Sequence, residues 1–259
     1  MKASRLILLL VVALGMLTSA ALADWNVGDP YKMYFPQLPD PNGWDVGAFG
    51  LADDWRCTQT GSVDDIHIWF SELHDGPPDV AYVDVRIYSN DPNYQGQGYG
   101  APKDVLWGGD VGLGHDDFSI STRQVGTGDQ GFYYISIDGV GSIAEFRHEN
   151  IYQLNITDIV DPFIQERGMI YWLEVSFSGP GRTFGWKTAD LDAYPEPYTG
   201  RHFANDAVYK ALLSSLPWNE LTDPVTGESL DLAFVITPEP GTLALLALGG
   251  IGLLRRRRS

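Results

Sequence analysis

Carboxylates that stand close together are the residues of this chain whose spacing most clearly suggests chemistry. The two acidic groups are Asp53-Asp54 with Asp64-Asp65, and Asp190-x-Asp192 with Glu196. Calcium takes several carboxylate and carbonyl oxygens as ligands. Glycoside hydrolysis instead needs one protonated and one ionised carboxyl. The acidic groups therefore raise two hypotheses, a structural calcium site and a glycosidase.

The calcium hypothesis assigns Asp53, Asp54 and Asp206 as ligands that tie loops together. The calcium-loop pattern Asp-x-Asp-x-Asp-Gly with a distal glutamate does not occur, so we favour solvated loop carboxylates. The glycosidase hypothesis is not favoured either. With 34 Asp and Glu residues, acidic pairs are expected from composition alone.

Aromatic side chains offer a different chemistry, because an exposed ring can stack on a sugar. The chain contains 8 Trp, 13 Tyr and 11 Phe. We assign Trp69 and Trp172 to the core because they lie in alternating segments. The aromatic residues of turn-rich segments are the candidates for a carbohydrate-binding module: Tyr94, Tyr99, Trp107, Tyr194 and Tyr198.

Other catalytic motifs do not occur. The sequence contains no Gly-x-Ser-x-Gly, no His-Glu-x-x-His and no Gly-x-x-x-x-Gly-Lys-Ser/Thr. Cys57 is the only cysteine, so it forms no intrachain disulfide, and we expect it to be buried and inert. The net charge of −17 argues against nucleic acid and anionic lipid as partners. The sequence thus favours a protein that is not an enzyme.

Strand patterns dominate the segments that must position these residues. Polar and apolar residues alternate in stretches separated by Gly, Pro, Asn and Asp. The clearest stretches are 65–70, 81–88, 131–137, 151–156, 170–177 and 231–236. They predict an all-β fold, an antiparallel two-sheet sandwich of jelly-roll type with at most one or two short helices. We place a short helix at 206–215 and a helical turn at 158–165.

The start of the chain has the order of a secretory signal peptide. Lys2 and Arg5 precede an apolar segment, and small residues follow up to Ala21 and Ala23. We expect signal peptidase to cut after Ala23, which assigns 1–23 as the signal. The remaining body, 24–236, is predicted to be a single exported domain whose proline-rich segment 24–42 lies across the sandwich.

The end of the chain has three parts in a fixed order. Pro238-Glu239-Pro240 comes first, an apolar segment at 242–254 follows, and the last part is Arg255, Arg256, Arg257 and Arg258. The apolar segment is shorter than the roughly 20 residues of a spanning helix. The arginines are expected to stay on the cytoplasmic side.

This order resembles the PEP-CTERM sorting signal of exported bacterial proteins, also described as an ice-binding protein C-terminal type. The resemblance assigns 237–259 as a sorting signal that ends in a short hydrophobic transmembrane helix. It implies that an exosortase-type transpeptidase cuts near the Pro-Glu-Pro. The segment then anchors the precursor transiently in the inner membrane, and the product reaches the cell surface or the extracellular matrix, where exopolysaccharide is a candidate partner. An anchor that is never cut is the alternative.

The body is also similar to an uncharacterised domain of exported bacterial proteins. The resemblance rests on the peptides at 51–61, 65–69, 184–188, 203–209 and 231–236. That domain has no assigned activity. Our leading hypothesis is therefore a non-enzymatic exported protein, with a carbohydrate-binding module as the first alternative and a glycoside hydrolase as the second.

Overall fold

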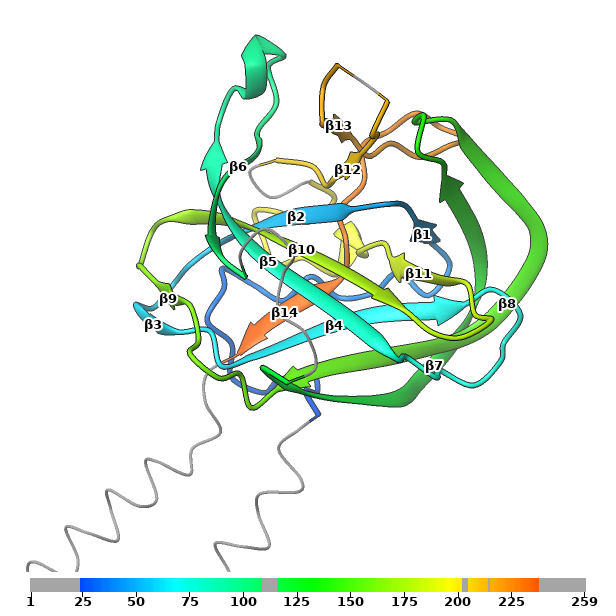
Figure 1. Cartoon of the computed structure of the whole chain (residues 1–259), viewed down its shortest axis with the longest axis horizontal. Helices are drawn as coiled ribbons and strands as arrows, with labels where there is room; N and C mark the ends of the chain where they lie inside the picture. Colours follow the sequence, from blue (N-terminus) through cyan, green and yellow to red (C-terminus); the bar gives the residue numbers. More distant parts are fainter. Residues whose placement is uncertain (1–23, 109–115, 202–204, 214, 238–259) are drawn as a thin grey trace, which may run out of the picture.

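The computed structural model describes residues 24–108, 116–201, 205–213 and 215–237. Nearly all regular structure in these residues is strand, which confirms the predicted fold class. The helical elements among them are two 3₁₀ turns, η1 (Tyr94–Gly96) and η2 (Leu191–Ala193). Two six-stranded sheets pack against each other (Figure 1).

The first sheet closes on itself. Its order is β11-β1-β7-β8-β4-β14, and β11 also pairs with β4, so β11, β1, β7, β8 and β4 form a ring. All its pairs are antiparallel except the parallel pair of β1 and β7. The strands are β1 (Trp44–Gly47), β4 (Asp65–Glu72), β7 (Ser119–Ile135), β8 (Gly141–Thr157), β11 (Phe184–Lys187) and β14 (Phe234–Thr237). Two members of this ring, the long strands β7 and β8, are strongly curved in Figure 1.

The second sheet is open and wholly antiparallel, with the order β13-β12-β2-β10-β5-β6. Its strands are β2 (Leu51–Arg56), β5 (Tyr82–Asp91), β6 (Ala101–Trp107), β10 (Ile170–Ser178), β12 (Val208–Lys210) and β13 (Trp218–Glu220). A small pair, β3 (Gly61–Ser62) and β9 (Ile164–Gln165), lies apart from both sheets.

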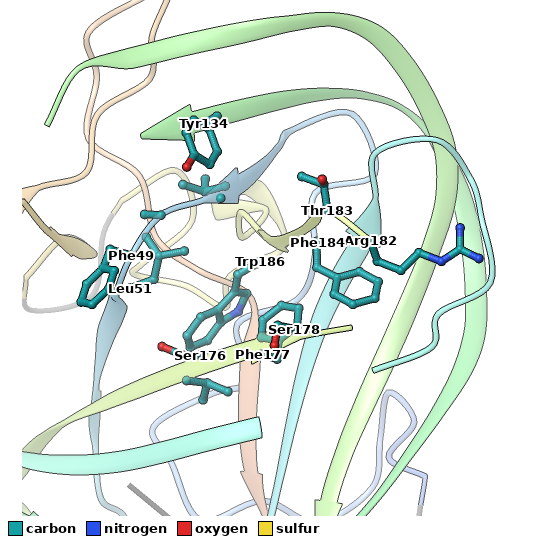
Figure 2. Close-up of a pocket in the computed structure, with 14 residues that line it drawn as sticks. Phe49, Leu51, Tyr134, Ser176, Phe177, Ser178, Arg182, Thr183, Phe184 and Trp186 are labelled. Carbon is teal, nitrogen blue, oxygen red and sulfur yellow. The ribbon is translucent and has the colours of Figure 1, made fainter. Parts of the chain in front are cut away.

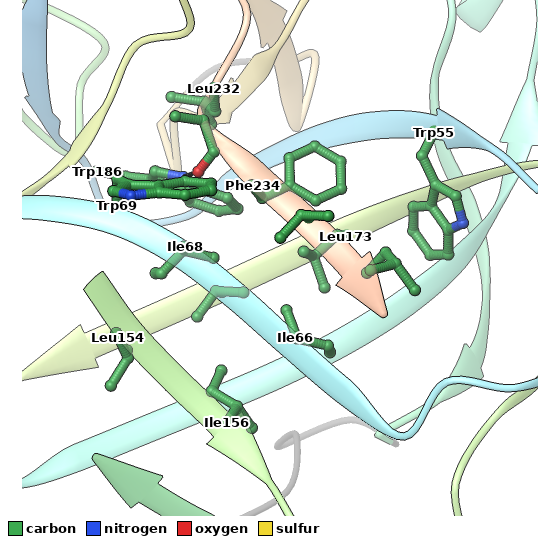
Figure 3. Close-up of a cluster of buried hydrophobic side chains, with 14 of the residues drawn as sticks. Trp55, Ile66, Ile68, Trp69, Leu154, Ile156, Leu173, Trp186, Leu232 and Phe234 are labelled. Atoms are coloured by element: carbon green, nitrogen blue, oxygen red, sulfur yellow. Dashed lines mark hydrogen bonds between the residues drawn. The ribbon is translucent and has the colours of Figure 1, made fainter. Parts of the chain in front are cut away.

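The main core lies between the two sheets (Figure 3). On β4 the alternate residues Ile66 and Ile68 are fully buried there, and on β10 Leu173 is buried with them. Phe234 of β14 lies between two indoles, with its ring centroid 6.3 Å from those of both Trp55 and Trp186. Burial of this apolar surface is the main stabilising contribution to the fold.

The segment 24–42 packs against the sandwich, as the sequence predicted. Trp25 packs edge-on against Trp69 with ring centroids 5.9 Å apart. The backbone N–H of Lys32 donates to the carbonyl of Ile236 (2.8 Å), so this segment is also hydrogen-bonded next to β14. The arm is therefore part of the folded body.

The two predictions of helical structure within the body are wrong. The stretch 206–215 contains β12, whose Val208 pairs with Ala52 of β2. The stretch 158–165 ends in β9, and Asp158 and Asp161 have φ values of 53° and 57°. Left-handed residues interrupt a right-handed helix, and sheet pairing outweighed the local helix propensity of the first stretch.

Candidate functional site

An apolar groove opens beside β1, at the edge where the two sheets meet (Figure 2). Its volume is about 400 Å³, within the size range of small-ligand sites. Side chains of β1, β2, β7, β10 and β11 line it, together with those of the connecting residues 48–49 and 182–183. Those that carry aromatic rings are Phe49, Tyr134, Phe177, Phe184 and Trp186.

The groove combines exposed rings with hydroxyl groups. Phe49 is 55% exposed and Tyr134 is 48% exposed, whereas Trp186 is fully buried and its Nε1–H donates to the Ala233 carbonyl (2.8 Å). Ser176, Ser178 and Thr183 supply hydroxyls, and Arg182 supplies a positive charge. Among the residues that the structure describes, no Asp, Glu or His lines the groove. The groove can therefore stack on a ring and donate hydrogen bonds, but it holds no acid–base pair.

The predicted ligand-binding aromatics lie elsewhere, in three separate places. Tyr94 is buried in the turn between β5 and β6, with its ring centroid 6.1 Å from that of Tyr99. The Tyr99 hydroxyl donates to the Trp218 carbonyl (3.0 Å). Trp107 is half-buried, and its Nε1–H donates to the Asp161 carbonyl (2.8 Å). These polar groups already have partners within the chain.

The remaining two predicted aromatics lie beside the N-terminal arm. Tyr194 is buried, and its hydroxyl donates to Asp231 Oδ2 (3.1 Å). Burial and the neighbouring Asp231 carboxylate raise the pKa of Tyr194. Tyr198 is half-buried and packs edge-on against Tyr34, with ring centroids 5.1 Å apart. The five residues thus form no common binding face.

The Asp53-Asp54 pair is buried within strand β2, not exposed in a loop. Neighbouring strand residues point to opposite faces, and the two carboxylates accept hydrogen bonds from different partners. Asp53 accepts the backbone N–H groups of Asp54 (2.7 Å) and Leu232 (2.6 Å), whereas Asp54 accepts the side-chain amide of Asn205. Burial, followed by repulsion from Asp231, raises the pKa of Asp53. Burial likewise raises the pKa of Asp54.

The structure does not join Asp53, Asp54 and Asp206 into a calcium site. Within the described ranges, no group of three or more His, Cys, Asp or Glu side chains is placed to hold a metal ion. The other acidic pairs have structural partners. Lys32 Nζ lies 3.0 Å from Asp64 Oδ2, and Asp190 Oδ1 accepts the backbone N–H of Asp192 (3.0 Å) at the start of η2.

Cys57 is buried, as predicted, and its thiol donates to the Gln59 carbonyl (3.0 Å). Burial raises the pKa of this thiol, which disfavours the reactive thiolate. The residues that sequence reasoning missed are Phe49 and Tyr134 of the groove and a buried set of Asp45, His148 and Lys187. No local motif marks either group, because long-range strand pairing brings them together.

The predicted processing residues fall outside the described residues. They are Ala21, Ala23, Pro238, Glu239, Pro240 and Arg255 to Arg258. The residues next to them are held firmly. Asp24 Oδ1 accepts a hydrogen bond from Asn155 Nδ2 (2.8 Å), and Thr237 is the last residue of β14, paired with Asp65.

The fold and the ends together define an exported β-sandwich with a sorting tail. A family model, Domain of unknown function (DUF7901), matches residues 33–237, and the chain belongs to this family. The PEP-CTERM protein-sorting motif matches residues 237–258, which marks the chain as an exported protein processed by an exosortase-type system. These matches confirm both resemblances found in the sequence, that of the body and that of the sorting signal.

Neither a curated protein nor a solved structure matches the chain. In the described part of the chain no helix has the length and apolar character needed to cross a membrane. The hydrophobic helix predicted at 242–254 lies outside that part.

Proposed function

We propose that the protein is a non-enzymatic component of the cell surface or extracellular matrix, and that it binds a matrix polysaccharide. The observation that carries this proposal is the composition of the groove beside β1. Exposed rings at Phe49 and Tyr134 suit the flat faces of sugars, and the nearby hydroxyls and Arg182 suit sugar hydroxyl groups. The polysaccharide is bound outside the cell, where the sorting motif directs the chain.

Binding without turnover is favoured by two observations about the carboxyl groups that the structure describes. Asp53 and Asp54 are fully buried, so a sugar cannot reach them. The described residues that line the groove offer no carboxyl group to act as acid, base or nucleophile. A glycoside hydrolase therefore has no specific observation in its favour, and the binding role is the better-supported alternative.

The proposal is tested with the processed protein and the exopolysaccharide of its host. Binding is measured by calorimetry, and new reducing ends are measured in the same samples. We expect saturable binding with no release of reducing ends. Release of reducing ends would contradict the non-enzymatic role, and absence of binding would contradict the polysaccharide role of the groove.

A further inference from the structure

Asp45 and Lys187 form an unusual pair inside the ring of strands. They are directly opposite each other on the antiparallel strands β1 and β11, so both side chains point to the same face. Their neighbours Val46 and Trp186 face the core between the sheets. Asp45 and Lys187 therefore point away from that core, and both side chains are fully buried.

The reactive atoms lie close together. Lys187 Nζ is 3.4 Å from Asp45 Oδ2, and His148 Nε2, from β8, is 2.8 Å from the same oxygen. Asp45 Oδ1 and His148 Nδ1 are buried without a hydrogen-bond partner among the described residues. The amine thus faces a carboxyl group that is polarised by an imidazole and has one unpaired oxygen.

The surroundings hold this carboxyl in place and keep out water. The ring of Phe132 packs against His148 with centroids 5.8 Å apart. A Cβ atom on Gly185 would lie 2.7 Å from the backbone carbonyl carbon of Asp45, so only glycine leaves room at this point. The Lys187 ammonium also donates to the Gly43 carbonyl (3.1 Å), which aims its nitrogen toward β1.

A fully buried ion pair is a costly arrangement, because both charges lose their hydration. Joining the two groups as a neutral amide removes both charges and leaves only a carbonyl and an N–H to satisfy. We propose that Lys187 and Asp45 are joined by an intramolecular isopeptide bond that forms after the body folds. The bond links β1 to β11 within the closed ring.

The step is a condensation that needs no co-reactant. Lys187 gives up one ammonium proton, and its nitrogen lone pair attacks Asp45 Cγ. A new C–N bond forms, the bond from Cγ to one carboxyl oxygen breaks, and that oxygen leaves as water with the protons released by the nitrogen. His148 Nε2 contacts the carboxyl oxygen and is placed to deliver a proton to it as it leaves.

Two further features support the reaction. Burial lowers the pKa of Lys187, which favours the neutral amine that the attack requires. The chain contains a single cysteine, so a disulfide cannot serve as its covalent link. An isopeptide bond would supply that link in a protein directed outside the cell.

The test is the intact mass of the folded, processed protein, with both chain ends identified by peptide mapping. We expect a mass lower by one water molecule than the sequence requires. We also expect a branched tryptic peptide that joins the Lys187 and Asp45 segments. A wild-type mass equal to the sequence mass, after the folded protein has been held at neutral pH, would overturn the proposal.

Two variants sharpen the test. Asp45→Asn should lose ammonia in place of water, so its mass should equal that of the wild type. Lys187→Arg should keep its full sequence mass.

The pair of Lys210 and Glu174 is a matched internal control. It is an ion pair of 2.7 Å with a partly exposed lysine, so it should show no branched peptide. A branched peptide there as well would show that the cross-link arises from sample handling, and would overturn the assignment.

Discussion

His67 Nε2 lies 3.3 Å from the hydroxyl of Thr237, the residue that ends β14 immediately before the sorting tripeptide. The other ring nitrogen, Nδ1, lies 2.8 Å from Asn155 Oδ1. Asn155 Nδ2 donates to Asp24, the first residue after the predicted signal. Because that contact orients the amide, Nδ1 of His67 carries the proton and donates to Asn155 Oδ1. One buried side-chain network therefore connects the two ends of the body.

Acid should weaken this network. Burial lowers the pKa of His67 to about 4, whereas the unfolded chain has the ordinary value near 6.5. The folded state thus resists protonation, and the contribution is fully present above about pH 6.5. It is lost as the pH falls from there toward 4, by roughly 3 kcal/mol in total. Urea unfolding between pH 7.5 and 4.5 measures this loss.

His67→Gln is the control for that titration. It removes the ionisable ring, so its free energy of unfolding should not show this loss. The difference in free energy of unfolding between wild type and variant should therefore shrink as the pH falls from about 6.5 toward 4. A difference that is independent of pH would contradict the assignment of the acid loss to His67.

Asp54→Asn should stabilise the protein at neutral pH. Burial raises the pKa of Asp54, so the folded state binds a proton more tightly than the unfolded state does. The buried carboxylate therefore lowers the free energy of unfolding by an amount that grows with pH. The loss begins above about pH 3.8, the ordinary pKa, and is complete once the pH exceeds the raised pKa of the folded state. We expect the variant to gain about 1 kcal/mol at pH 8 and nothing near pH 3. Thermal melting at both pH values tests this.

The matched control is Asp79→Asn. The Asp79 side chain is largely exposed, so the Tm of this variant should differ little from that of the wild type at either pH. Equal shifts for both variants would indicate a general effect of net charge, not of burial.

Removing either exposed ring of the groove should weaken polysaccharide binding without loss of stability. Phe49→Ala and Tyr134→Ala should each weaken binding about fivefold, because one stacking contact contributes about 1 kcal/mol. Tyr82→Ala is the control, since this ring is 46% exposed on β5 and does not line the groove. Calorimetry with the host exopolysaccharide measures all three. Unchanged affinity in both groove variants would remove the groove from the proposal.

Phe234→Ala should unfold the body far more easily. This ring is fully buried between Trp55 and Trp186, so its removal leaves a cavity that costs about 3–5 kcal/mol. Val225→Ala, at a site that is 72% exposed, should change the free energy of unfolding by less than about 0.5 kcal/mol. Urea denaturation compares the two, and a similar small loss in both would contradict the position of Phe234 in the core.

Alternation along the chain was enough to predict most of the long strands. The period-two patterns at 65–70 and 170–177 became β4 (Asp65–Glu72) and β10 (Ile170–Ser178). Closure of the first sheet could not be predicted, because it depends on the parallel pair of β1 with β7 and on the contact of β11 with β4. Neither pairing leaves a local signature.

The candidate site was harder to predict than the fold. Tyr94 and Tyr194 were chosen as ligand candidates because they lie in turn-rich sequence, but packing within the chain buries both. The acidic pair Asp53-Asp54 suggested a loop, yet it lies inside β2, where hydrogen bonds from Leu232 and Asn205 offset its burial. Partners so distant in sequence cannot be inferred from spacing.

Processing in the native host tests the central claim most directly. The wild-type protein is compared with a variant carrying Pro238→Ala, Glu239→Ala and Pro240→Ala, by intact mass and cell fractionation. We predict that the wild type loses its tail and reaches the cell surface or medium, while the variant stays full-length in the membrane. If both proteins remain full-length in the membrane, the tail is a permanent anchor and the surface or matrix role is contradicted.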